Sequence, residues 1–164
     1  MSKLDEIEAE ILVASVFSDV RPARGVAGLC DFRLGGRLSR LMKQSFITGA
    51  SGEVVLVPGK PLLTFDKVLV FGAGDSSAFG ERSYVELIDK ILDTLTGLAA
   101  RTAVVELPGR QAGTIEAARA VDLLLTAAGG SPQHDVWTLV EEVEGRTSIE
   151  QHMVEAKRRV RRSL

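Results

Sequence analysis

The most constraining feature of the sequence is the stretch at residues 67–81, KVLVFGAGDSSAFGE, where a short apolar run passes through glycines into a long helical pattern. Residues 68–71 are apolar at every position, which is typical of a strand buried on both faces of a helix-covered sheet. Gly72 and Gly74 follow at once, and glycine lets a chain leave a strand tightly without Cβ clashes. The stretch therefore predicts a buried strand, a turn and a helix, around which the other segments can be arranged.

Other short apolar segments predict further strands. In residues 10–17 the apolar side chains divide between two sides, with Ile11, Val13 and Phe17 on one and Leu12, Ala14 and Val16 on the other. A strand that is apolar on both sides is expected in the interior of a sheet. Similar segments predict strands at residues 53–57, 102–107 and 135–143, and residues 60–66 are expected to form a connector, with a short edge strand at 62–65 as the alternative. Residues 135–143 alternate between apolar and polar, which indicates an edge strand with one wetter face.

Helical spacing of apolar residues predicts helices at residues 27–34, 37–44, 81–100 and 115–128, and a last helix from Thr147 onward. Thr114 is the predicted N-cap of the fourth helix, and Thr147 with Glu150 fits a capping box. The inner stripe expected for the last helix is Ile149, Met153, Ala156 and Val160. Strands that alternate with helices predict one domain over residues 1–164, an α/β fold in three layers with a mixed, mostly parallel sheet between helices.

Composition and charge exclude several classes of protein. A net charge of −2 argues against nucleic-acid binding through bulk positive charge. The N-terminus is charged where a signal peptide needs an apolar core, and no apolar run approaches the ~20 residues that span a bilayer. The single cysteine, Cys30, cannot form an internal disulfide and is expected to be a small core residue, with a reactive thiol as the alternative. We therefore expect a cytoplasmic protein that does not act at a membrane.

The best candidate site is the loop that follows the organising strand. Its candidate ligand-binding residues are Gly72, Gly74, Asp75, Ser76, Ser77 and Gly80. Glycine-rich turns between a strand and a helix present N–H groups and the positive end of the helix dipole, which suits a phosphate. The spacing fails the dinucleotide fingerprint, because its third glycine would fall at Ser77. A purely structural turn and a ligand-binding loop both remain open.

No arrangement of residues predicts catalysis or metal binding. Gly49-Ala-Ser51-Gly52 is one residue short of a nucleophile elbow. The two histidines, His134 and His152, and the single cysteine cannot supply a zinc site with the usual spacing, and His152 is expected to be a solvated helix residue. The basic run at residues 157–162 suits the C-terminus of a helix, and an acidic partner or nucleic acid is the alternative. We predict no catalytic residue, metal ligand or cofactor.

The order of the motifs resembles the N-terminal domain of the leucyl, or cytosolic, aminopeptidases. In that family an Asp-x-x-x-x-Gly-x-Leu segment follows the first strand, and Asp31, Gly36 and Leu38 match it here. A Phe-x-Gly-x-x-Gly-Glu turn then leads into a strand, and the matching residues are Phe46, Gly49 (one position further on), Gly52 and Glu53. Gly72-Ala-Gly74 stands where the family usually has Gly-Leu-Gly. The resemblance covers about residues 9 to 162, and it implies a macro-domain-like fold.

The resemblance also implies that the catalytic half of the family is missing here. The metal ligands of those enzymes lie in a separate C-terminal domain, and the sequence has no Asn-Thr-Asp-Ala-Glu-Gly-Arg run. We therefore expect a stand-alone, non-catalytic domain that binds a protein partner or self-associates, since family N-domains lie at the periphery of hexamers. One alternative is a macro-like module that binds ADP-ribose or a related nucleotide, with the diphosphate at residues 72–80. Another is an accessory part of an aminopeptidase whose catalytic domain is on another chain.

Overall fold

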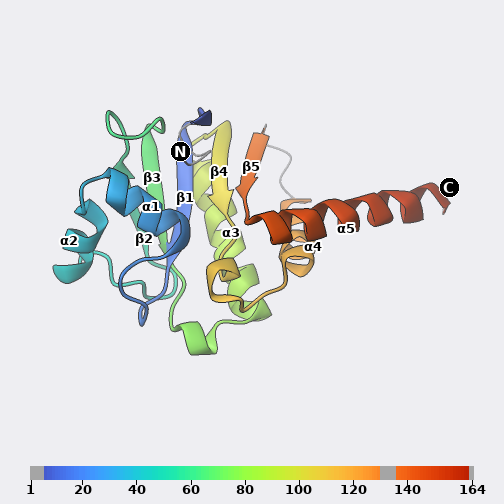
Figure 1. Ribbon diagram of the computed structural model, residues 1–164, viewed down its shortest axis with the longest axis horizontal. Helices are drawn as coiled ribbons and strands as arrows, with labels where there is room; N and C mark the ends of the chain where they lie inside the picture. The colour runs from blue at the N-terminus through green and yellow to red at the C-terminus, as the bar shows by residue number, and fades with distance from the viewer. Residues whose placement is uncertain (1–5, 130–135, 163–164) are drawn as a thin grey trace.

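The computed structural model describes residues 6–129 and 136–162, with side chains at 137–154 in the second range, and its centre is a five-stranded sheet (Figure 1). The strands are β1 (Ile11–Val16), β2 (Val54–Pro58), β3 (Lys67–Gly72), β4 (Thr102–Glu106) and β5 (Val136–Val140), in the order β2-β3-β1-β4-β5. β2 is antiparallel to β3 and the other pairs are parallel. The predicted mixed, mostly parallel sheet is confirmed, with β5 at an edge.

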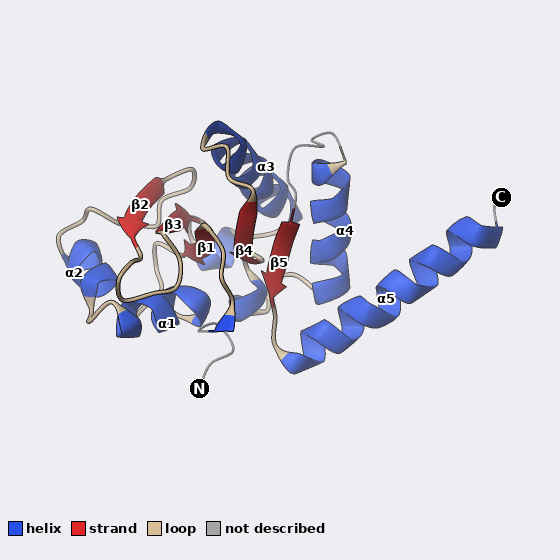
Figure 2. Ribbon diagram, turned by 90° about the horizontal axis from the view of Figure 1, so that it is seen from above, coloured by secondary structure: helices blue, strands red, loops and turns tan. Residues whose placement is uncertain are grey.

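Helices cover both faces of the sheet (Figure 2). They are α1 (Gly25–Arg33), α2 (Arg37–Lys43), α3 (Glu81–Gly97), α4 (Ala117–Ala128) and α5 (Val143–Arg162), with short 3₁₀ turns η2 (Ser76–Ala78) and η3 (Arg110–Ala112). The side chains of β1 alternate between two cores as predicted. Those of Ile11, Val13 and Phe17 pack with α3 and α4, and those of Leu12, Ala14 and Val16 pack with α1 and α2. The three-layer α/β fold is therefore the arrangement that the apolar pattern required.

Two capping predictions are wrong, and the alternative of an edge strand at 62–65 is not realised. Residues 62–65 form turns instead of an edge strand, although Leu63 and Phe65 are buried there. Thr114 does not cap α4, because its hydroxyl donates to the carbonyl oxygen of Gly109 at 3.0 Å and the helix begins three residues later. Thr147 does not begin the last helix, because α5 already starts at Val143 and the Thr147 hydroxyl donates to the Val143 carbonyl at 3.0 Å.

The last helix, α5, begins just after β5 and runs past α4 away from the sheet (Figure 2). Ile149 and Met153 pack against the α3–α4 core, as the predicted inner stripe requires. The predicted stripe positions Ala156 and Val160, the basic side chains at 157–162 and His134 lie outside the described side chains. Among the described residues, no helix has both the length and the apolar character that crossing a membrane would require.

The strand order fixes where a ligand site is expected. The chain passes from β1 to β3 on one side and later to β4 on the other side of β1. The connections therefore diverge at the carboxyl ends of β1 and β4, and open α/β sheets usually bind ligands in the crevice at such a point.

Candidate functional site

The predicted loop after β3 is held by close backbone contacts. A Cβ added at Gly72 would lie 1.9 Å from the carbonyl oxygen of Ala50, so no larger residue fits there. Gly74 has a φ of +78°, and its N–H donates to the Gly49 carbonyl at 2.8 Å. Gly80 is the N-cap of α3 and has no atom within 4 Å of its Cβ position. The first two glycines are therefore explained by the turn and by close backbone approach.

The same loop already uses its N–H groups within the protein. Ser76 donates both its N–H, at 2.9 Å, and its hydroxyl, at 2.5 Å, to the carboxylate of Asp19 in the loop after β1. Ser77 donates its N–H and hydroxyl to Asp75, at 2.8 and 2.6 Å, and Ala78 donates its N–H to the Asp75 carbonyl at 3.2 Å. The hydrogen bonds from Ser76 lower the pKa of Asp19. Two carboxylates thus occupy the donors that a phosphate would need.

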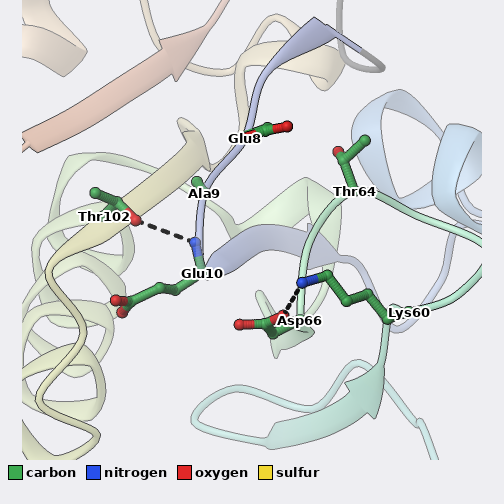
Figure 3. Close-up of a pocket in the computed structure, with 7 residues that line it drawn as sticks. All are labelled: Glu8, Ala9, Glu10, Lys60, Thr64, Asp66 and Thr102. Atoms are coloured by element: carbon green, nitrogen blue, oxygen red, sulfur yellow. Dashed lines mark hydrogen bonds and ion pairs between the residues drawn. The ribbon is translucent and has the colours of Figure 1, made fainter.

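One hollow lies at the amino ends of the central strands (Figure 3). It has a volume of about 460 Å³ and is lined by Glu8, Ala9, Glu10, Lys60, Thr64, Asp66 and Thr102. Lys60 forms an ion pair with Asp66 at 2.6 Å, and the Glu10 N–H donates to the Thr102 hydroxyl at 3.1 Å. Lys60, Asp66 and Thr102 are therefore already engaged within the protein at this exposed surface.

A second hollow lies at the carboxyl ends of β4 and β5, beside the point between β1 and β4 where the fold predicts a site. Its volume is about 230 Å³, and it is lined by Gly25, Val26, Leu29, Glu106, Arg110, Gln111, Val140, Glu141 and Glu142. The residues come from the start of α1, the end of β4, the turn η3, and the junction between β5 and α5. Three stretches that are far apart in the sequence, 25–29, 106–111 and 140–142, therefore meet at this one place.

Glu106 is the unusual residue of this hollow. Its side chain is only 7% exposed, and its Oε1 accepts the N–H of Val26 at 2.9 Å, in the first turn of α1. Its Oε2 has no hydrogen-bond partner among the described residues, and neither has Oε1 of Gln111. Burial raises the pKa of Glu106 to about 7, and nearby Glu141 raises it further. The hydrogen bond from the Val26 N–H lowers it, as does the nearby Ser15 N–H, which forms no hydrogen bond with Oε2. The carboxyl group therefore changes its charge near neutral pH.

Gly25 makes room for this carboxyl group. Its φ is +58°, and an added Cβ would lie 2.1 Å from Oε1 of Glu106 and 2.6 Å from Oε1 of Gln111. A left-handed backbone and two crowding oxygens both require glycine at this position. The acceptor oxygens of Glu106 and Gln111 therefore lie side by side over the start of α1.

An ion pair closes the other side of the hollow. The Arg110 guanidinium donates to both carboxylate oxygens of Glu141, at 2.8 and 3.1 Å, and to the Ile115 carbonyl at 2.6 Å. The two charged side chains are 19% and 7% exposed. The pair ties η3 to the β5–α5 junction, and it leaves the Glu106 carboxyl group outside the ion pair.

Sequence reasoning did not identify Glu106, Gln111 or Gly25 as site residues. The one available signal was a charged residue in the apolar run TAVVEL.

The expectation for Cys30 is confirmed, because the thiol is fully buried and burial raises its pKa to about 12. His152 lies on α5 with its side chain 32% exposed, and its ring also lies 2.7 Å from a carboxylate oxygen of Asp122, a contact that links α5 to α4.

Comparison with solved structures places this architecture among the macrodomains. The Trypanosoma brucei macrodomain in complex with ADP-ribose matches with a TM-score of 0.70 and 16% identity, over 90% of this chain and 65% of that one. Tomato leucine aminopeptidase matches with a TM-score of 0.58 and 18% identity, over 90% of this chain and 33% of that one. At these identities the likeness shows the fold alone, and it confirms the macro-domain-like α/β class.

Sequence comparison gives the family. The N-terminal domain of the cytosol aminopeptidase family matches residues 15–128, so the chain belongs to this family. Cytosol aminopeptidase of Pseudomonas aeruginosa is 35% identical over 77 residues, which are 47% of this chain and 16% of that protein. The resemblance noted in the motif order is confirmed. The chain thus corresponds to a small part of its curated relatives, the part that the family assigns to its N-terminal domain.

Proposed function

We propose that this chain is a non-catalytic, cytoplasmic domain of the aminopeptidase N-terminal type that acts by binding a protein partner. The observation that carries the proposal is the outward face of α1. Phe32 is 80% exposed, and Leu29, three residues earlier on the same side of the helix, is 41% exposed. Aromatic and large aliphatic side chains that gather on a surface mark protein-interaction sites more often than ligand sites.

The position of this face supports an interaction role. Leu29 also lines the hollow around Glu106, so the apolar face of α1 and the acidic hollow form one continuous surface. Val143, which follows Glu142 of the lining at the start of α5, is 81% exposed. An apolar rim around a polar centre gives a partner both contact area and a means of orientation.

The proposal is tested by comparing three immobilised proteins: wild type, Phe32→Ser and Leu62→Ser. Leu62 is 59% exposed and lies in the turns before β3, so its substitution is a matched control for loss of surface apolarity. We expect wild type and Leu62→Ser to retain the same proteins from native extract, and Phe32→Ser to lose them. Sedimentation of the three purified proteins shows whether the partner is a second copy. Equal retention by all three would refute the role of this face.

A nucleotide-binding module is the second candidate, because the macrodomain of T. brucei matched above was solved with ADP-ribose. In this reading the diphosphate would lie on the loop from Gly72 to Gly80, with Gly74, Asp75, Ser76 and Ser77. Asp19 and Asp75 would first have to release the donors that they hold, and a phosphate beside them would be repelled. Calorimetry with ADP-ribose distinguishes the two candidate functions. Saturable heat at millimolar ADP-ribose would favour nucleotide binding over protein binding, and no heat would remove the nucleotide-binding candidate.

The aminopeptidase activity of the family is a separate question. The comparisons match only its N-terminal domain, and we propose that these residues contribute no catalytic group. Purified protein with manganese or zinc should therefore not turn over leucine anilide. Turnover that survives repeated purification would contradict the non-catalytic assignment. Turnover by a separate metallopeptidase chain that rises above that chain's own activity when this protein is added would identify that chain as the partner.

A further inference from the structure

The hollow at the carboxyl ends of β4 and β5 contains buried oxygen atoms that accept no hydrogen bond from the part of the chain that the structure describes. Two buried acceptor oxygens, Oε2 of Glu106 and Oε1 of Gln111, have no hydrogen-bond donor among the described residues. Buried acceptors without donors are rare in native proteins, because each one loses its hydration without compensation. A third such atom, Oγ of Ser15, belongs to the side of β1 that faces α3 and α4, whereas Glu106 faces α1, so it is not part of this set. When Glu106 is ionised, these two oxygens therefore lack a hydrogen-bond donor among the described residues.

The charge of the lining and the volume of the hollow limit which chemical group could donate hydrogen bonds to these oxygens. The lining contains three carboxyl groups, those of Glu106, Glu141 and Glu142, against the one guanidinium of Arg110. A diphosphate would be repelled here and a cation attracted. The volume of about 230 Å³ is below the ~300–1,000 Å³ of sites for drug-sized ligands. One side chain of a partner fits these limits better than a nucleotide does.

We propose that this hollow binds the side chain of a lysine on the protein partner, with the ammonium group donating to Glu106 Oε2 and Gln111 Oε1. The four-carbon stem of the lysine lies against Leu29 and Val140, the apolar residues of the lining. The proposal rests on the proposed function in one respect, which is that the cation belongs to a protein. The binding of an ammonium group by Glu106 and Gln111 does not depend on whether the cation belongs to a protein.

Lysine is favoured over arginine because three of the four carboxylate oxygens of Glu106 and Glu141 already accept hydrogen bonds within the protein. An arginine gains most from a fork that contacts both oxygens of one carboxylate. Oε1 of Glu106 already accepts the Val26 N–H at 2.9 Å, and both oxygens of Glu141 already accept from Arg110. One carboxylate oxygen and one amide oxygen that the described residues leave unpaired suit the compact ammonium group, which has three donors that do not lie in one plane.

The affinity should depend on pH near neutrality. The groups that face Glu106 are Glu141, Glu142 and Arg110 of the lining and the thiol of Cys30 beneath α1, which stays neutral because its pKa is raised to about 12. With the pKa of Glu106 at about 7, the carboxyl group is mostly neutral at pH 6 and mostly ionised at pH 8. A lysine ammonium is charged at both values. Binding should therefore be about tenfold weaker at pH 6 than at pH 8, and it should release a proton near pH 7.

The test uses the full chain labelled with ¹⁵N and two probes, Nα-acetyl-lysine methylamide and the same compound acetylated on Nε. The amide signal of Val26 is the reporter, because that N–H donates to Glu106. We expect saturable shifts at pH 8 with the lysine probe, about tenfold weaker binding at pH 6, and none with the Nε-acetylated probe. Glu106→Gln should abolish the shifts, and Glu8→Gln, which removes a carboxyl group from the other hollow, should retain them.

Each alternative outcome has a distinct meaning. Absence of saturable shifts at tens of millimolar probe, or equal shifts in Glu106→Gln, would overturn the lysine site. Equal shifts with the Nε-acetylated probe would also overturn it, because the contact would then be apolar only. If the lysine probe fails while Phe32-dependent retention of a partner persists, the site is wrong and the protein-binding function stands. If the probe binds but no partner depends on Phe32, the cation site stands and the protein source of the cation is wrong.

Discussion

Replacing Glu106 with glutamine should make the protein more stable at pH 8 and should change it little at pH 5. The folded protein raises the pKa of this carboxyl group from 4.5 to about 7. Between these two values the folded state holds a proton that the unfolded state has lost, so stability falls as the pH rises. At about 1.4 kcal/mol for each pKa unit, the free energy of unfolding loses about 3 kcal/mol across the interval. Glutamine has the same shape and does not titrate.

The assay is urea unfolding of wild type and Glu106→Gln at pH 5 and pH 8. The change in stability between the two pH values should differ between the proteins by about 3 kcal/mol in favour of the variant. Groups common to both proteins cancel in this comparison. The carboxyl groups whose pKa is lowered, such as those of Asp19, Asp66 and Glu81, lose their contribution only as the pH falls below about 4, outside the interval. A difference below about 1 kcal/mol would refute the burial of Glu106 in a hollow without a cation.

Three further substitutions test how the layers are joined. Arg110→Ala should lower the free energy of unfolding at pH 7 by about 2–3 kcal/mol, measured with urea, because Glu141 would be left buried without its partner. A decrease of less than about 0.5 kcal/mol would indicate that the ion pair is exposed to solvent. Tyr84→Phe should cost about 1 kcal/mol, since the hydroxyl donates to the Ala120 carbonyl at 2.8 Å and links α3 to α4, and an unchanged unfolding midpoint would argue against that bond. Gly72→Ala should cost about 3 kcal/mol or more, because the added methyl group meets a main-chain carbonyl at 1.9 Å, so normal yield and melting temperature would contradict the close approach.

The sequence predicts those parts of the fold that depend on local periodicity. Alternation placed Ile11 and Leu12 in opposite cores, and helical spacing placed α3 against the sheet. It does not predict where a polar side chain finds its partner. Thr114 has the residue type and position of a cap, but its hydroxyl forms a hydrogen bond within the preceding turn. Residues 62–65 are apolar enough for a strand, yet turns can bury Phe65 equally well.

The candidate site is less accessible to sequence reasoning than the fold is. Gly25, Glu106, Gln111 and Glu141 are separated by up to 116 positions in the chain (25 to 141), and only the parallel register brings the ends of β4 and β5 to the start of α1. The glycine-rich loop after β3 has a recognisable pattern, because turns have local requirements. A buried carboxyl group has no such local pattern. The loop that looked functional in the sequence is therefore explained largely by its turn geometry.

The buried carboxyl group of Glu106 links stability to binding. At pH 8 its charge lowers the stability of the isolated domain by about 3 kcal/mol relative to its protonated form. A role in packing alone does not account for this cost, because glutamine would accept the same Val26 N–H without a charge. A cation that enters the hollow offsets the cost, since it pairs with the charge where water is excluded. Burial of the charge alone predicts that Glu106→Gln is more stable at pH 8, whereas a ligand-binding glutamate predicts in addition that this variant no longer binds the lysine probe.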